Sequence, residues 1–222
     1  MEYKTNNQNI IYLKWDNKEH VKAVSNLHIK LLPESILSKL GYLFLSKFYY
    51  SKLTKNNLIE VYLYKQNEEY VGFGSCTNKP FTFMKEGMRK YFILVFVLLG
   101  IIMVSKPNRI ILFLKFLLKM KKDTLLGKLQ QNEYCYKMGE YLSCGVLENF
   151  RKSIDPIEKI SIPNVILKTV IAHFKINNIQ NILGRILKTN DRAIKFYQKH
   201  SVIFIQSDNP NEVAIIIQTK SI

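Results

Sequence analysis

The chain has 222 residues, 47% of them apolar, which supports one sizeable core or at most two small domains and excludes a disordered tail. Its formal charge of +16 indicates an acidic partner, such as nucleic acid, an anionic membrane surface or a polyphosphate cofactor, or else a lysine-rich solvated surface. No nucleic-acid-binding motif accompanies the charge, so we expect no specific binding of nucleic acid.

Cysteine and histidine do not predict a metal site. The three cysteines, Cys76, Cys135 and Cys144, are odd in number and match no metal-ligand spacing, which favours a reducing compartment. The four histidines form no cluster along the chain. The first ten residues lack the apolar region of a signal peptide, so we expect a cytoplasmic protein that holds no metal.

The first third of the chain predicts a strand, two helices and a hairpin. Residues 10–15 read as a strand, and residues 18–32 place apolar side chains at helical spacing. Pro33 is tolerated in the first turn of a helix, so we expect a second helix over 33–53. Residues 58–65 and 69–76 then read as two strands joined by a short turn, which predicts a hairpin.

The last third alternates strands and helices. We expect strands over 139–147, 179–188, 201–207 and 212–219 and helices over 162–176 and 190–200. The strand–helix–strand unit predicts one parallel pair, while the hairpins are antiparallel. The fold class is therefore α/β (α+β): one domain over residues 1–222, with a mixed, mostly antiparallel sheet of six to seven strands flanked by helices and a helical insertion at about 80–130.

The middle of the chain is unusually apolar. Residues 91–105 would form a helix of about 22 Å, shorter than a bilayer core of roughly 30 Å. Residues 108–122 continue the apolar pattern with three lysines on one helical face, and residues 85–128 hold ten Lys or Arg and two acids. Two interpretations of residues 91–122 stay open. The helices pack on each other and over the sheet, or they lie on an anionic membrane surface.

The strongest motif is "NDRAIKFYQKH", residues 190–200. Asn190 is a good N-cap and Asp191 suits the positive end of a helix dipole, while Ala193, Phe196 and Tyr197 share the inner face. The pattern N-x-x-A-x-x-F-Y-x-K after an apolar strand resembles the closing motif of the GNAT acyltransferase superfamily. Residues 71–73 and 139–146 are similar to its third and fourth strands. Residues 28–49 resemble the opening helices of GNAT members from polysaccharide gene clusters.

This resemblance implies transfer of an acetyl group from acetyl-CoA to the primary amine of a small molecule or amino sugar. Glu140 matches the position of a base and Tyr197 that of the acid that protonates the leaving thiolate. Backbone N–H groups near Cys144 and Val146 would bind the coenzyme arm and the oxyanion. Taken alone, Glu140 reads equally as an exposed carboxylate and Tyr197 as a core aromatic residue. Cys144 has no neighbouring histidine and is a poor candidate nucleophile.

The phosphate loop of the family departs from its pattern here. Where the family has Gln or Arg followed by two glycines, this alignment has Glu158, Ser161 and Pro163. Ser161 could cap the following helix, Asn164 lies in its first turn, Lys159 with Arg151 and Lys152 supplies positive charge, and Asn190 completes the expected coenzyme contacts. We expect the helix and its dipole without the glycine cradle. The alternative is a catalytically inactive GNAT fold that acts as a membrane-surface or protein-interaction module.

Overall fold

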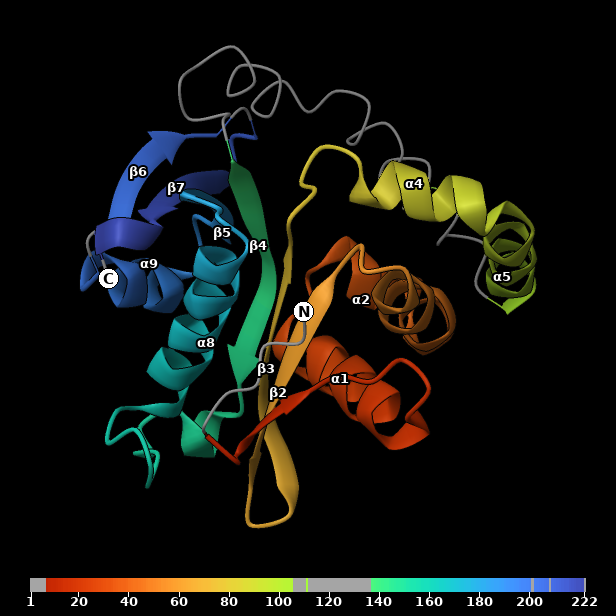
Figure 1. Cartoon of the computed structure of the whole chain (residues 1–222). Helices are drawn as coiled ribbons and strands as arrows, with labels where there is room; N and C mark the ends of the chain where they lie inside the picture. The colour runs from red at the N-terminus through yellow and green to blue at the C-terminus, as the bar shows by residue number, and fades with distance from the viewer. Residues whose placement is uncertain (1–6, 106–110, 112–136, 201, 208, 222) are drawn as a thin grey trace.

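A mixed seven-stranded sheet forms the centre of the molecule (Figure 1). The computed structural model describes residues 7–105, 111, 137–200, 202–207 and 209–221. The strand order is β1-β2-β3-β4-β5-β7-β6, and among these described strands only the neighbours β4 and β5 run parallel. The predicted fold class is therefore confirmed, including the single parallel pair. The strands are β1 (Ile10–Tyr12), β2 (Glu60–Gln66), β3 (Glu69–Thr77), β4 (Met138–Val146), β5 (Asn181–Leu187), β6 (Val202–Gln206) and β7 (Glu212–Gln218).

Helices cover both faces of this sheet (Figure 1). One face carries α1 (Lys18–Leu31), α2 (Ile36–Leu40), α3 (Tyr42–Phe44), the π-helix η1 (Leu45–Leu53), α4 (Phe83–Lys90) and α5 (Phe92–Ser105). The opposite face carries α8 (Ile162–Ile176), which packs on β2, β3 and β4. The short helix α9 (Asp191–Gln198) lies beside β6 and β7, while the 3-10 turns η3 (Glu148–Phe150) and η4 (Thr219–Ser221) follow β4 and β7.

The helical region after Pro33 differs from the prediction. A single helix over 33–53 is wrong, because Gly41 has φ 96° and separates α2 from α3, which continues directly into η1. Ser35, not Pro33, begins α2, since its hydroxyl accepts a hydrogen bond from the N–H of Ser38 at 3.0 Å. In η1 the consecutive aromatic residues Phe48, Tyr49 and Tyr50 are all buried, an arrangement that the regular α-helical spacing did not predict.

The junction between β4 and β5 changes along the length of the two strands. The β3–β4 ladder pairs Cys76 with Tyr141 and Ser75 with Ser143, so its register skips Leu142. Such a bulge bends and twists a strand. The parallel β4–β5 pairing ends at Tyr141 and Gly184, although β4 continues to Val146 and β5 to Leu187. The two strands therefore separate in the middle of the sheet.

The apolar middle is described only in part. The helix expected over 91–105 is confirmed as α5, whereas the expected helix over 108–122 lies outside the described residues apart from position 111. Val95, Leu98 and Ile102 of α5 are buried against the core. In the described part of the chain no helix is both long and apolar enough to cross a bilayer.

Candidate active site

Two cavities meet where β4 and β5 separate. The larger has a volume of about 1510 Å³ and lies between the end of β4, the start of α8 and α9. The smaller, of about 760 Å³, lies between β4, β5, the segment from α1 to α2 and the start of α4. We call them the basic cavity and the apolar cavity. Seven residues line both of them: Leu31, Leu32, Tyr141, Cys144, Asn190, Ala193 and Tyr197.

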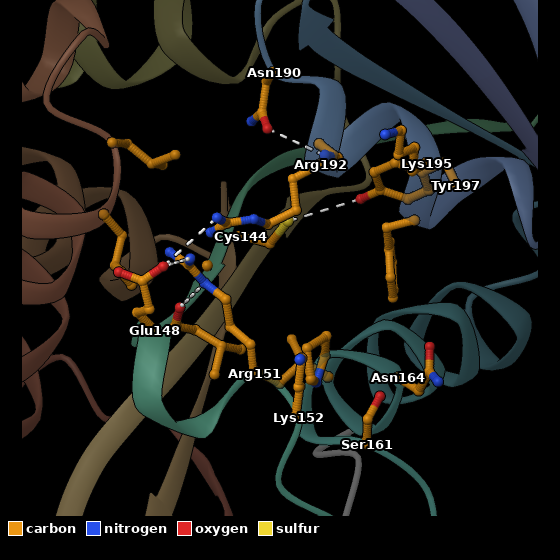
Figure 2. Close-up of a pocket in the computed structure, with 18 of the residues that line it drawn as sticks. Cys144, Glu148, Arg151, Lys152, Ser161, Asn164, Asn190, Arg192, Lys195 and Tyr197 are labelled. Atoms are coloured by element: carbon orange, nitrogen blue, oxygen red, sulfur yellow. Dashed lines mark hydrogen bonds and ion pairs between the residues drawn. The ribbon is translucent and has the colours of Figure 1, made fainter.

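Cationic side chains dominate the basic cavity (Figure 2). Two of these cations directly follow η3, and three lie on α9 or at its C-terminal end. Among the described lining residues only Glu148 and Asp191 carry carboxylates. Asn190 caps α9 as predicted, since its side-chain oxygen accepts from the Ala193 N–H at 3.1 Å. The cavity therefore favours an anion of several charges. Its five cations are Arg151, Lys152, Arg192, Lys195 and Lys199.

Glu148 joins two arginines across the basic cavity. One of its oxygens lies 3.3 Å from Arg151 Nη1 and 3.6 Å from Arg192 Nη2, and Figure 2 shows both side chains turned toward it. Arg151 is also fixed from behind, because its Nε donates to the Val146 carbonyl at 2.9 Å. The Glu148 side chain is largely exposed, so these ion pairs are weak and a stronger anion can displace them.

The start of α8 keeps its helix but offers few backbone donors. Ser161 occupies the N-cap position of α8 as expected. Its side chain makes no capping hydrogen bond, so the expected side-chain cap is wrong. The N–H of Ile162 already donates to the Ser153 carbonyl at 3.1 Å, and Pro163 has none. Asn164 lines the cavity, and among the described residues its buried Oδ1 finds no hydrogen-bond partner.

The turn that precedes α8 is held by the fully buried Asp155. Asn7 and Asn9 each donate to its carboxylate at 3.1 Å, and the Tyr64 hydroxyl and two backbone N–H groups of the turn donate as well. Burial alone would raise the pKa of Asp155, but these hydrogen bonds outweigh it and lower the pKa to about 2. The carboxylate is therefore charged, and the turn has one fixed shape.

This turn directs two of the expected residues away from the cavities. Lys159 is exposed, with φ 58°, and lines neither cavity. Glu158 also lines neither one, and its carboxylate accepts a hydrogen bond from Lys168 instead of facing a phosphate. The positive charge at the cavity comes from Arg151 and Lys152, which directly follow η3, and not from Lys159.

Tyr197 and Cys144 meet at the boundary of the two cavities (Figure 2). The phenol oxygen lies 3.7 Å from Cys144 Sγ, and the Tyr197 side chain is almost fully buried. Burial raises the pKa of Tyr197 well above its usual value, and the nearby Cys144 adds to the effect. Burial also raises the pKa of Cys144, although hydrogen bonds with Tyr197 and Tyr141 oppose it. Both groups therefore keep their protons at neutral pH.

Tyr141 is a boundary residue that the sequence did not single out. It lines both cavities and follows Glu140 on β4. A Cβ on Gly74 of the neighbouring strand would lie 3.0 Å from the Tyr141 hydroxyl and closer still to Ile166, so glycine gives the ring its space. Nothing in the local pattern distinguishes Tyr141 from other strand tyrosines, because its role depends on the cross-strand neighbour.

Glu140 lies in the apolar cavity. It is only 8% exposed and lies 3.2 Å, Oε1 to Nε, from Arg185 of β5, so the interpretation as an ordinary exposed carboxylate is wrong. Tyr49 lines the same cavity, and its pKa is raised by burial and further by the Glu140 charge. Glu140 is thus a buried, oriented carboxylate that faces the smaller cavity.

A neutral histidine lies deeper in the apolar cavity. His28 is fully buried, with Nδ1 2.5 Å from the Tyr50 hydroxyl and Nε2 3.1 Å from the Ser35 hydroxyl. Burial lowers the pKa of His28 to about 4. The cavity therefore contains a polar network of neutral hydrogen-bonding groups in addition to its charged carboxylate.

Comparisons with known proteins give the architecture its name. No protein-family model and no curated protein matches the sequence. Among solved structures, a GNAT-family acetyltransferase from Staphylococcus aureus Mu50 is 14% identical, with a TM-score of 0.51 over 95% of this chain and 98% of that one. The chain has the GNAT fold. The resemblance drawn from the motifs is thereby confirmed for the fold.

Two further structures carry the same GNAT fold at similar distance. An N-acetyltransferase from the same Staphylococcus strain is 12% identical, with a TM-score of 0.50 over 96% of this chain and 99% of that one. Arabidopsis thaliana NAA60, in complex with a bisubstrate analogue, is 10% identical with a TM-score of 0.50 over 94% and 97%. The fold is thus matched along nearly the whole of each chain.

Three features of the basic cavity fit a polyphosphate co-substrate such as acetyl-CoA, which the GNAT resemblance implies. The cavity has five cations that suit the phosphates, an orphaned buried oxygen on Asn164 that can accept from an N–H or O–H group of the co-substrate, and β4 residues beyond the last β4–β5 pair that border it. The glycine cradle is absent, because Pro163 at the start of α8 has no N–H and the N–H of Ile162 already donates to Ser153. The residues present therefore fit the phosphates by side chains. In the described ranges no group of His, Cys, Asp and Glu forms a metal site.

Proposed function

We propose that this GNAT-fold chain is an N-acetyltransferase, which transfers the acetyl group of acetyl-CoA from the basic cavity to a primary amine in the apolar cavity. One observation carries the proposal: Cys144 and Tyr197 line both cavities at the point where β4 leaves β5. A ligand in each cavity would meet its partner there. Transfer reactions need such a shared boundary, because the donor and the acceptor must come within near-contact distance.

The co-substrate would lie along the free edge of β4. Residues 143–146 pair with β3 on one side and leave the other side open toward the cavity. The amide groups of a pantetheine arm can pair with such an edge in the manner of an added strand. The phosphates would then reach Arg151, Arg192 and Lys195, where they displace Glu148. Ser161, Asn164 and Asn190 border the same space and would complete the contacts.

The acceptor amine would be deprotonated from the side of the apolar cavity. Glu140 takes the ammonium proton, directly or through a water, and the free amine attacks the thioester carbonyl. A C–N bond forms and the C–S bond breaks, while a backbone N–H of the segment from Cys144 to Val146 stabilises the oxyanion. Arg185 lies 3.2 Å from the Glu140 carboxylate and orients it.

The leaving thiolate would take its proton from Tyr197, and the phenolate would recover a proton from the nitrogen of the new amide, directly or through water. The phenol lies at the cavity boundary, and its raised pKa keeps the proton in place until the thiolate forms. Cys144, 3.7 Å from that phenol, would then be a neighbour of the co-substrate sulfur and not a nucleophile. Its raised pKa supports this, because a nucleophilic cysteine requires a thiolate.

The acceptor that we propose is a small molecule or an amino sugar. The apolar cavity carries Glu34, Glu140 and Glu212 against Lys85 and Arg185, so its carboxylates can attract an ammonium group. Ser35, Asn209 and Asn211 supply neutral polar contacts of the kind that hydroxyl-bearing ligands use. A cavity of about 760 Å³ is of the size that holds one small ligand.

A second candidate is an interaction module without activity. Its support is the absent glycine cradle together with the exposed apolar side chains of α5. The two candidates differ in one measurement, because a module needs no coenzyme. Calorimetry with acetyl-CoA separates them first, and thiol release with a panel of small amines and amino sugars follows.

We expect micromolar binding of acetyl-CoA and amine-dependent thiol release. Coenzyme A lacking the acetyl group is the matched control for binding, since it carries the same phosphates. Absence of binding by both ligands at millimolar concentration would overturn the acetyltransferase and leave the module. Binding without thiol release across the whole panel would instead contradict the proposed acceptor class.

A further inference from the structure

The outward side of α5 exposes a continuous stripe of large apolar residues. Six of them are between 46% and 90% exposed: Phe92, Ile93, Phe96, Val97, Ile101 and Val104. Their spacing of one, three and four residues places them on one side of the helix, opposite the buried Val95, Leu98 and Ile102. The Phe92 and Phe96 rings stack on each other at 6.2 Å between centroids.

The neighbouring helix α3 extends this stripe. Its Tyr42 and Leu43 are 39% and 40% exposed, and α3 packs against α5. We call these eight residues the α3–α5 apolar face. Monomeric proteins seldom expose so many large apolar side chains together, and such a patch usually marks an interaction site.

The helices next to this face are strongly basic, whereas α3 and α5, which carry it, hold no charged residue. Across α2, α3, η1, α4 and α5 there are six Lys or Arg and one acid, Glu86. Lys47, Lys85, Arg89 and Lys90 are exposed, and Glu86 already has Lys79 as an ion-pair partner at 3.2 Å. An occupant of this face must therefore accept apolar side chains at its centre and supply negative charge around them.

We infer that the α3–α5 apolar face docks on an anionic lipid bilayer. An interfacial helix buries its apolar side at the acyl boundary while its lysines bind acidic headgroups. A helix of 14 residues is about 21 Å long, so α5 lies in the interface and does not cross the bilayer.

Charge disfavours the other occupants. A second copy would bring two basic surfaces together, and the following residues 112–128 hold five Lys and one Asp, so they too add like charge. Nucleic acid would satisfy the lysines and leave the phenylalanines in water. A bilayer with acidic headgroups satisfies both requirements at once.

Docking would also orient the apolar cavity. Ile36 and Leu37 of α2 and Phe83 and Met84 of α4 line that cavity, and the same two segments continue into α3 and α5 (Figure 1). The cavity would therefore open beside the bilayer, where an acceptor carried on a lipid could reach it. This consequence rests on the proposed function, whereas the docking itself does not.

Sedimentation with vesicles tests the docking on the full chain. We expect the protein to pellet with phosphatidylcholine vesicles that contain phosphatidylglycerol, to stay in solution with phosphatidylcholine alone, and to be released by salt. The double variant Ile93→Ser/Ile101→Ser should weaken binding by about tenfold or more, because it removes two inserted side chains. Lys85→Glu/Arg89→Glu should abolish the preference for phosphatidylglycerol.

The matched control is Ile154→Ser/Ile203→Ser, which removes the same atoms from two exposed isoleucines outside the face. It should pellet like the unchanged protein. Equal loss in both double variants, or no pelleting of the unchanged protein, would overturn the docking. So would a concentration-dependent dimer that only Ile93→Ser/Ile101→Ser dissociates, because a second copy would then cover the face. Acetyl-CoA binding, measured on the same samples, reports independently on the proposed function.

Discussion

The two cavities are built in opposite ways from the same break in the sheet. The basic cavity takes its character from Arg and Lys side chains on a loop and on α9, most of them exposed. The apolar cavity takes its character from buried groups such as Glu140, His28 and Tyr49, which neighbouring side chains fix. An exposed cationic wall suits phosphates, which need charge more than shape, while a buried, fixed wall suits an acceptor that must be oriented for attack.

The largest effect on activity is expected at the boundary that the two cavities share. Tyr197→Phe removes only the hydroxyl, so it should lower kcat by roughly 10²–10⁴-fold while acetyl-CoA affinity stays within about twofold. Stopped-flow thiol release and calorimetry measure the two quantities. Tyr141→Phe, at the same boundary, is the matched control and should lower kcat far less. Equal losses in both variants would show that packing, and not proton donation, matters here.

A variant on the apolar side should affect the acceptor alone. Glu140→Gln removes the base, so we expect kcat/KM for the amine to fall by about 10²–10³-fold with unchanged acetyl-CoA binding. The change also leaves the half-buried Arg185 without its carboxylate, which costs on the order of 3 kcal/mol of stability. Thermal unfolding therefore accompanies the kinetics. Recovery of the rate at high pH, where the amine loses its proton unaided, would support the role of a base, and a flat pH profile would contradict it.

Variants on the basic side should affect the coenzyme alone. Arg192→Ala and Lys195→Ala should each weaken acetyl-CoA binding by about tenfold and reduce its dependence on salt, because each removes one charge-assisted contact. The KM of the amine should not change. Lys188→Ala, which removes an exposed lysine that lines neither cavity, should have no effect. A similar loss in all three variants would mean that net charge, and not this wall, attracts the coenzyme.

The apolar side should also determine how the fold responds to acid. The pKa of His28 is about 4 in the folded chain and near 6.5 when unfolded, so the unfolded state binds more protons between these values. The contribution of His28 to the free energy of unfolding should therefore be fully present above pH 6.5. It should be lost, by up to about 3 kcal/mol, as the pH decreases toward 4. Urea unfolding at a series of pH values measures this slope. His28→Gln should remove about half of it, because burial also lowers the pKa of His173 to about 4 and that residue contributes a similar part. His20→Gln, at a half-exposed position, should leave most of it.

The smallest effect is expected for Glu148 in the basic cavity. Glu148 occupies the two arginines in the absence of phosphate, so Glu148→Gln should tighten acetyl-CoA binding by about two- to fivefold. Isothermal titration resolves a change of this size. A weaker affinity in the variant would mean that Glu148 orients the arginines and does not compete for them.

Local sequence patterns predicted most of the fold and about half of the site. The apolar alternation of 58–76 and the strand–helix–strand unit of 139–188 determined the hairpin and the parallel pair, because both depend on neighbours in sequence. The N-cap at Asn190 and the position of Tyr197 followed from a short motif in the same way. The break at Gly41 was missed, since a glycine is tolerated in many helices and its positive φ is set by packing.

The remainder of the site depends on contacts between distant segments. Arg185 reaches Glu140 from a neighbouring strand, and Arg192 reaches Glu148 across the cavity. Neither pair is visible from spacing along the chain. Lys159 was expected at the phosphates because it precedes α8, but the turn around Asp155 directs it outward. Sequence separation hides such turns, because Asp155 binds Asn7, which lies 148 positions earlier.

The Asp155 carboxylate also makes the site sensitive to what is attached ahead of Asn7 and Asn9. Asp155 fixes the approach to α8 through Asn7 and Asn9, so a bulky fusion or a protease nick ahead of residue 10 would loosen a turn on the far side of the sequence. Preparations that differ only in their leading residues would then differ in coenzyme affinity. Such a difference in coenzyme affinity would report the strength of the hydrogen bonds around Asp155.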